Sequence, residues 1–212
     1  MNLVFASNNA HKLAEVREIM PAGINVLSLK DIGFESEIEE TGSTLAENSA
    51  IKAETVYDWL SGNGQWAVDG VFADDTGLEI DALGGEPGVF TARWAELETG
   101  VHLPEMETYA ANRAKALRVL TDKVDRGCQF KTVITLIRCK EIGTESLKRI
   151  QVEGVVRGVM TEEERGTSGF GYDAIFKPDG YDKTFGALPA EVKNNISHRA
   201  RALEELVKVL EC

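Results

Sequence analysis

Cysteine is scarce in this chain of 212 residues, and its three cysteines, Cys128, Cys139 and Cys212, lie far apart in the sequence. An odd number at such spacing excludes a disulfide framework and a Cys-x-x-Cys metal site. Long apolar runs are also absent, since no stretch approaches the roughly 18 residues that span a membrane. The N-terminal segment has no positive charge before its short apolar run, so we expect no signal peptide. These absences predict a cytoplasmic protein without a membrane partner.

Positive charge is in short supply, because 23 Lys and Arg stand against 35 Asp and Glu and give a net charge of −12. Nucleic-acid polymers and anionic membranes require an excess of basic residues, so we expect neither as a partner. A small anion remains compatible with this charge, because a pocket can gather a few cations. The 43% apolar and 27% charged residues are typical of a globular protein. The length suits one domain, which we expect to cover residues 1–212.

Short apolar runs and stretches of helical spacing interleave along the chain. The predicted strands are 3–6, 24–29, 71–73, 130–139, 147–160 and 174–176. The predicted helices are 13–20, 45–60, 106–124 and 196–210. We expect a hairpin across 141–145. Because strands and helices do not alternate strictly, the sequence predicts an α/β fold with a mixed sheet.

The first candidate site is the polar segment Ser7-Asn8-Asn9-Ala10-His11-Lys12, between a predicted strand and a predicted helix. A helix N-terminus presents N–H groups and the positive end of the helix dipole, which suit an anion. Ser7 and Asn9 add short polar groups and Lys12 adds a mobile cation, so one interpretation is a phosphate-binding loop. The other is an ordinary asparagine cap beside an exposed lysine.

The second candidate is Asp74-Asp75-Thr76-Gly77, at the end of the predicted strand 71–73. Adjacent residues of a strand point to opposite faces, so we expect different roles for the two carboxylates. One can hold a divalent cation or take a proton from water while the other braces a loop. An acidic turn is the alternative. Asp-Thr-Gly also occurs in aspartic proteases, but these need two such aspartates, so a protease would require a symmetric dimer.

The third candidate is Glu39-Glu40-Thr41-Gly42, which precedes a predicted helix carrying Glu47, Asn48 and Lys52. Asn48 and Lys52 are four residues apart and share one helical face. Glu40 can supply a second carboxylate to a metal bound by Asp75. The alternatives are a capping role for Glu47, since Thr44-Leu45-Ala46-Glu47 has the form of a capping box, and a solvated position for Lys52.

The last candidates lie in the C-terminal third of the chain. Glycines around Phe170 in the segment 167–173 allow close approach to a flat ligand, against which the ring can stack. A hairpin turn explains the same pattern. Lys193, His198 and Arg199 lie around the start of the last predicted helix, where they can contact ring edges and phosphates. A polar helix face is the alternative for them.

Together these segments resemble the inosine triphosphate pyrophosphatase family, which hydrolyses non-canonical purine nucleoside triphosphates. The matching motifs occur in order along nearly the whole chain. They are Ser7-x-Asn9-x-x-Lys12, Glu39 to Gly42 with Glu47-Asn48 and Lys52, Ala73 to Leu78, Gly84 to Gly88 with Ala92-Arg93, Gly169 to Asp173, and Ile196 to Arg199.

The resemblance implies an elongated mixed sheet with flanking helices and two lobes around a central nucleotide cleft. It also implies a homodimer that hydrolyses ITP, dITP or XTP to the monophosphate and pyrophosphate with Mg²⁺, cleansing the nucleotide pool. Asp75 matches the general base of the family. Asp75 and Glu40 match its metal ligands. The implied substrate-binding residues are Ser7, Asn8, Asn9, Ala10, His11, Lys12, Lys52, Thr76, Phe170, Gly171, Tyr172, Asp173, Lys193, His198 and Arg199. A nucleotide sensor without turnover is the alternative hypothesis.

Overall fold

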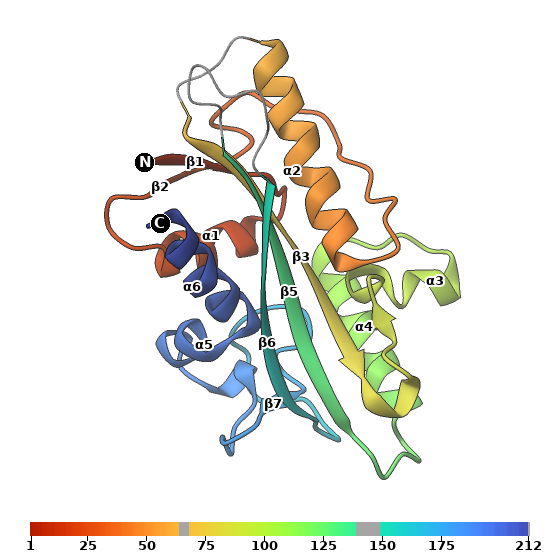
Figure 1. Cartoon of the computed structure of the whole chain (residues 1–212). Helices are drawn as coiled ribbons and strands as arrows, with labels where there is room; N and C mark the ends of the chain where they lie inside the picture. Colours follow the sequence, from red (N-terminus) through yellow and green to blue (C-terminus); the bar gives the residue numbers. More distant parts are fainter. Residues whose placement is uncertain (64–67, 139–148, 212) are drawn as a thin grey trace. The chain divides into compact units, whose positions relative to one another are not determined.

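The computed structural model describes residues 1–63, 68–138 and 149–211 (Figure 1). Its strands are β1 (Asn2–Phe5), β2 (Asn25–Leu27), β3 (Gly70–Ile80), β4 (Pro87–Gly88), β5 (Gly127–Arg138), β6 (Arg149–Met160) and β7 (Phe176–Pro178). Its α-helices are α1 (Ala10–Ile19), α2 (Leu45–Gly62), α3 (Glu96–Thr99), α4 (Glu105–Val119), α5 (Ala190–Ile196) and α6 (His198–Leu210). Its 3₁₀ helices are η1 (Asp81–Leu83), η2 (Thr91–Arg93) and η3 (Phe185–Ala187). Within these ranges, no helix combines the length and apolar character needed to cross a membrane.

The strands form one hydrogen-bonded sheet in the order β2-β1-β3-β5-β6-β7, with β4 paired to β3. β1 runs parallel to both β2 and β3. β4 is antiparallel to β3, and β7 is antiparallel to β6. The sheet is therefore mixed, and the predicted α/β class is confirmed.

The chain divides into two compact units. The first comprises 1–75, 132–154 and 199–212, and the second comprises 76–131 and 155–198. β3, β5 and β6 each have residues in both units. The expectation of one domain over residues 1–212 stays a prediction, and each unit is described by itself.

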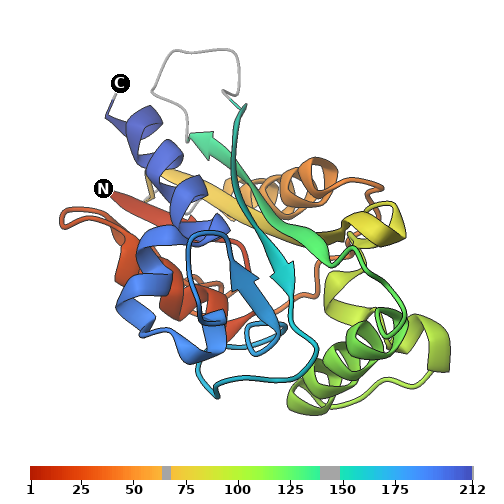
Figure 2. The ribbon, with the colours of Figure 1, turned by 90° about the horizontal axis from the view of Figure 1, so that it is seen from below.

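In the first unit, the side chains of β1 and β3 alternate between two faces, as strand geometry requires. One face packs against α2 and includes Val4, Val71 and Ala73. The other face packs against α1 and α6 and includes Leu3, Phe5 and Phe72. Figures 1 and 2 show α2 on one side of these strands and α1 with α6 on the other. Because helices cover both faces, β1 is apolar from Leu3 to Phe5 without alternation, which explains the continuous run at the N-terminus.

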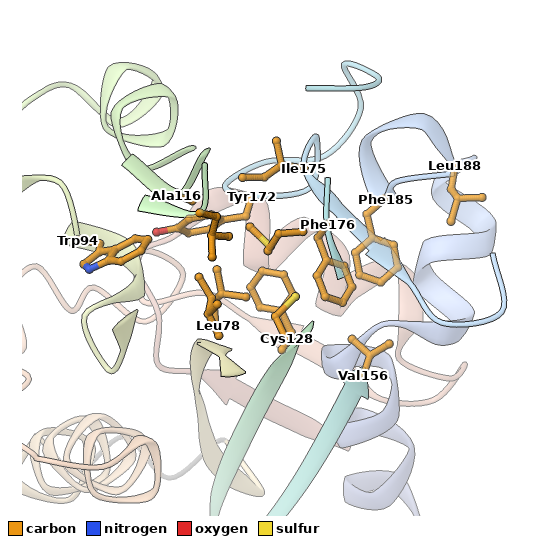
Figure 3. Close-up of a cluster of buried hydrophobic side chains, with 14 residues drawn as sticks. Leu78, Trp94, Ala116, Cys128, Val156, Tyr172, Ile175, Phe176, Phe185 and Leu188 are labelled. Carbon is orange, nitrogen blue, oxygen red and sulfur yellow. The ribbon is translucent and has the colours of Figure 1, made fainter. Parts of the chain in front are cut away.

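The core of the second unit is rich in aromatic side chains (Figure 3). The ring of Phe130 lies edge-on to Phe176, with 4.8 Å between the centroids. Cys128 is fully buried in this cluster, and burial raises the pKa of its thiol to about 12. Tyr172 belongs to the same core, so the core anchors the glycine-rich segment around Phe170.

Four sequence-based expectations need correction or comment. The predicted end of a strand at Asp74 is wrong, because β3 continues without a break from Gly70 to Ile80. The predicted helix 106–124 ends early, at Val119. The predicted helix 196–210 begins two residues later, as α6 at His198, because Ser197, whose backbone is extended, separates it from α5. The hairpin expected across 141–145 lies outside the described residues, although β5 and β6 are neighbours in the sheet.

Candidate functional site

The loop between β1 and α1 is held by its own polar side chains. Asn9 is the N-cap of α1, and its Oδ1 accepts a hydrogen bond from the backbone N–H of Lys12 at 2.9 Å. Ser7 Oγ accepts from the N–H of Asn9 at 3.2 Å. Asn8, Ala10 and His11 are exposed. The asparagine cap is thus present, and the exposed residues on either side of it are open to solvent or to a ligand.

Lys12 is not the exposed lysine of the alternative interpretation. Its ammonium donates to Asp74 Oδ1 at 3.0 Å, and its side chain is 16% exposed. Burial lowers the pKa of Lys12, and Asp74 only partly offsets that effect. The lysine therefore extends from α1 onto the carboxylate of β3.

Asp74 is a fully enclosed carboxylate with two cationic partners. Besides Lys12, the Nε and Nη2 atoms of Arg199 each lie 3.1 Å from its Oδ2. Arg199 also pairs with Glu15, and its side chain is 2% exposed. Burial alone would raise the pKa of Asp74, but Lys12 and Arg199 outweigh it and lower the pKa well below the usual range. Asp74 is therefore ionised and serves as a binding partner for cations inside the first unit.

Asp75 has different partners, which come from the α2 side of β3. Lys52 on α2 donates to Asp75 Oδ1 at 3.0 Å and to Glu40 Oε1 at 2.9 Å. Burial raises the pKa of Asp75, against the opposing effect of Lys52. Burial alone would lower the pKa of Lys52, but Asp75 and Glu40 raise it overall. The two neighbouring aspartates thus differ in partners and in electrostatics, as the alternation of strand side chains predicts.

The residues around Asp75 fit a magnesium ion. Asp75 Oδ2 is buried and has no hydrogen-bond partner in the described part of the chain. Glu40 has a partly exposed side chain and shares Lys52 with Asp75. Mg²⁺ is commonly held by one or two carboxylates together with substrate phosphates and waters. Over the described ranges, no group of three or more His, Cys, Asp and Glu forms a cage for a metal, so phosphates and waters would complete the coordination.

In the second unit, Asp173 stabilises the loop that carries Phe170. Its Oδ2 accepts from the backbone N–H of Phe170 at 2.8 Å and from Lys193 Nζ at 2.7 Å. A Cβ at Gly169 would lie 2.0 Å from the same oxygen, and its φ is +76°, so only glycine fits there. Lys193 Nζ also lies 4.9 Å from the centre of the Phe170 ring, within cation–π range. The structure therefore brings three of the predicted substrate residues together.

Tyr172 and His198 are buried rather than presented at the surface of this unit. The Tyr172 hydroxyl donates to the carbonyl of Thr91 at 2.9 Å, and burial raises the pKa of this phenol. The His198 ring stacks on Phe130, with 4.8 Å between centroids and 22° between planes. The Tyr172 hydroxyl is thus already engaged in the core, and a substrate contact of this residue stays a prediction. Gly171, between Phe170 and Tyr172, and Thr76, on β3, are partly buried.

Sequence reasoning missed two polar residues, each of which joins separate segments of its unit. Glu15 follows Lys12 by three residues on α1 and pairs with Arg199, a spacing that could have drawn attention to it. Asn112 on α4 is buried, accepts from the N–H of Ala95 at 2.7 Å and donates to the carbonyl of Ala92 at 2.9 Å. Its signal in the sequence is an amide on the face of α4 that also buries Tyr109 and Ala116.

Comparisons with known proteins cover nearly the whole chain. The model of the Ham1 family matches residues 3–209. A dITP/XTP pyrophosphatase of Flavobacterium johnsoniae is 43% identical over 210 residues, which are 99% of this chain and 98% of that protein. A dITP/XTP pyrophosphatase of Bacillus subtilis is 42% identical, over 98% of this chain and 96% of that protein. The structure of the Staphylococcus aureus Ham1 protein superposes with a TM-score of 0.79 and 35% identity, covering 100% of this chain and 98% of that one.

Proposed function

Because the chain belongs to the Ham1 family, we propose that it is a nucleoside triphosphate pyrophosphatase that hydrolyses non-canonical purine nucleoside triphosphates. The resemblance drawn from the sequence motifs is confirmed by matches over nearly the full length of both proteins. The observation that carries the proposal is the buried Asp75 Oδ2 without a hydrogen-bond partner in the described residues, beside Lys52 and Glu40. We infer ITP, dITP and XTP as substrates.

The reaction needs a base next to an anionic substrate. Water attacks the α-phosphorus, the bond from that phosphorus to the bridging oxygen of the β-phosphate breaks, and pyrophosphate leaves. Asp75 takes the proton of the attacking water, a role that suits a carboxylate oxygen with an unused lone pair. The polar loop at Ser7 to Lys12 and the ammonium of Lys52 supply donors and positive charge for the phosphates.

Magnesium is the metal that the proposal includes. Asp75 and Glu40 would hold it, and when bound it offsets phosphate charge and polarises the oxygens around the reacting phosphorus. Lys52 already lies between these carboxylates, at 3.0 Å from Asp75 and 2.9 Å from Glu40. It therefore keeps both carboxylates close together and limits their mutual repulsion before metal and substrate arrive.

The loop of the second unit suits a purine ring. Phe170 is partly exposed, and its backbone is fixed by Asp173, so its ring has a defined position. An aromatic ring stacks on any base, so stacking gives affinity rather than selectivity. Selection of a 6-keto purine over adenine requires donors to that oxygen, because a buried polar group left unpaired by the wrong base rejects it strongly. The proposal also includes a cytoplasmic location and a homodimer.

The test is pyrophosphate release by an Asp75→Asn variant. The wild-type chain, assayed with Mg²⁺ on ITP, XTP, dITP, GTP and ATP, should form IMP and pyrophosphate from ITP and favour the first three substrates. Asp75→Asn should lower kcat by about 100-fold or more, because the base is lost. Asp58→Asn is the matched control, since Asp58 is an exposed aspartate of α2.

Each other outcome has a distinct meaning. A near wild-type rate for Asp75→Asn would show that Asp75 is not the base. Release of IDP and phosphate would indicate cleavage of a different bond. Tight binding of ITP by the wild-type chain without any product would support the nucleotide sensor instead.

A further inference from the structure

Helix α4 contacts the loop that carries Phe170, although none of the motifs found in the sequence includes a residue of this helix. Two of its residues, Tyr109 and Arg113, lie four positions apart and therefore share one face of the helix. The Tyr109 ring lies 6.0 Å from the Phe170 ring, measured between centroids. Arg113 contacts the backbone of the residue after Phe170. Both contacts lie within the second unit.

The contact of Arg113 is with a peptide carbonyl. Its Nη1 donates to the Gly171 oxygen at 2.9 Å. Gly171 has a φ of +60°, a left-handed conformation that glycine adopts readily. A hydrogen bond from a guanidinium is stronger than one between neutral groups, so it fixes the direction of this carbonyl. The orientation of the peptide next to Phe170 thus depends on a side chain of α4.

Glu164 holds Arg113 in place from another segment of the same unit. Glu164 Oε1 lies 3.0 Å from Arg113 Nε, an ion pair whose angles are not those of a hydrogen bond. The Arg113 side chain is 19% exposed, whereas that of Glu164 is 45% exposed. The guanidinium is therefore mostly enclosed and is directed at the loop, while its carboxylate partner lies at the surface.

The other anchors of the loop act on different atoms. Asp173 accepts from the Phe170 N–H, and the Tyr172 hydroxyl reaches the Thr91 carbonyl. Among the contacts described for this loop, the Arg113 bond alone restrains the Gly171 carbonyl. Its loss would leave the loop attached at both sides of Gly171 but free to rotate the peptide between them.

We propose that Arg113 is a positioning residue for recognition of the purine base. By fixing the Gly171 carbonyl, it sets the orientation of the Phe170 segment against which the base would stack. This inference rests on the proposed function, because it assumes that the Phe170 loop receives the base. Arg113 acts through the loop and not on the phosphates, so its loss weakens substrate binding without slowing the chemical step.

The test compares Arg113→Met with Arg118→Met, a control on the same helix. Arg118 pairs with Glu98 at 2.7 Å and makes no described contact with the loop. Arg113→Met should raise KM for ITP about tenfold and leave kcat within about twofold. This pattern is expected because the lost interaction stabilises the bound substrate and the transition state equally. The preference of Arg113→Met for ITP over ATP should be smaller than that of the wild-type chain. Arg113→Lys should have a KM for ITP between those of the wild-type chain and Arg113→Met. Arg118→Met should change neither constant.

Calorimetric titration with IMP, which carries the base but lacks the β- and γ-phosphates, is the second measurement. Arg113→Met should bind IMP about tenfold more weakly than the wild-type chain, and Arg118→Met should bind it equally well. Unchanged KM and IMP affinity in Arg113→Met would overturn the inference, as would a loss confined to kcat. If Arg113→Met does not fold, Arg113→Gln is judged by the same criteria. A wild-type chain that releases no pyrophosphate but binds IMP would refute the proposed function and leave the binding test of Arg113 intact.

Discussion

At the residue scale, two adjacent aspartates have opposite relations to their surroundings. Asp74 neutralises the partly buried Lys12 of α1 and the buried Arg199 of α6, and these cations hold the pKa of Asp74 below its usual range. Asp75 Oδ1 accepts a hydrogen bond from Lys52, whereas Asp75 Oδ2 has no described partner. Burial raises the pKa of Asp75. The first arrangement favours the folded chain, whereas the second leaves one carboxylate oxygen without a described hydrogen-bond partner. We therefore separate a structural carboxylate, Asp74, from the proposed catalytic one, Asp75.

This separation predicts different stabilities for two isosteric variants. Asp74→Asn should lower the free energy of unfolding by about 3 kcal/mol, because Lys12 and Arg199 lose a buried counter-charge. Asp75→Asn should change it by less than about 1 kcal/mol, because Lys52 keeps Glu40 and an unfavourably buried charge is removed. Urea unfolding followed by circular dichroism measures both values. Equal losses in the two variants would contradict the assignment.

At the element scale, α2 shows how a local signal positions Lys52, a residue of the candidate site. Thr44 Oγ1 accepts from the Glu47 N–H at 3.1 Å, and Glu47 Oε2 accepts from the Thr44 N–H at 3.0 Å. This is the reciprocal capping box that the sequence predicts. Two helical turns later, the same helix carries Lys52 to Asp75. The start of α2 thus fixes the rotation with which Lys52 approaches β3.

Loss of this cap should weaken the fold in a measurable way. Thr44→Ala should reduce the free energy of unfolding by about 1 kcal/mol, because the Glu47 N–H loses its acceptor. Thr55→Ala is the control, since Thr55 is an exposed residue inside the same helix and alanine favours helix there. Urea unfolding should therefore give a loss only for Thr44→Ala. A Thr44→Ala chain as stable as wild type would mean that the box contributes nothing to stability.

At the scale of the whole molecule, a net charge of −12 coexists with buried cations. Lys52, Lys193 and Arg199 are each at most 6% exposed and each pairs with a carboxylate. Positive charge is therefore gathered against carboxylates inside the units, while the total charge of the chain stays acidic. The composition therefore predicts no polyanionic partner and is compatible with a nucleotide.

The chain should accordingly not bind duplex DNA. Fluorescence anisotropy with a labelled 20-base-pair duplex at about 50 mM salt should show no change at micromolar protein, because an acidic chain releases few counterions from DNA. ITP should bind under the same conditions. Salt-dependent DNA binding at micromolar protein would require a basic surface that the charge of the chain does not suggest.

Much of the fold and part of the site could be predicted from the sequence. The strand β1, the asparagine cap of α1 and the start of α2 follow from neighbouring residues, so local patterns suffice for them. The continuation of β3 through Asp74 and Asp75 could not be predicted, because charges interrupt an apolar pattern. They are tolerated within a buried strand only because Lys12, Lys52 and Arg199 neutralise them. The role of Arg113 was equally hidden, since its partner Gly171 is 58 residues away.

The sequence by itself determined the acidic character, the mixed α/β class, the family motifs and the opposition of Asp74 and Asp75. These properties depend on composition, on residues next to one another or on the alternation of side chains along a strand. The tertiary structure alone decided which charges meet, since Arg199 reaches Asp74 across 125 positions and Glu15 across 184. It also decided that Tyr172 and His198 are buried. Pairing and burial depend on the path of the whole chain, because that path decides which groups meet away from water. A buried charge is costly when it has no partner and tolerated when it has one.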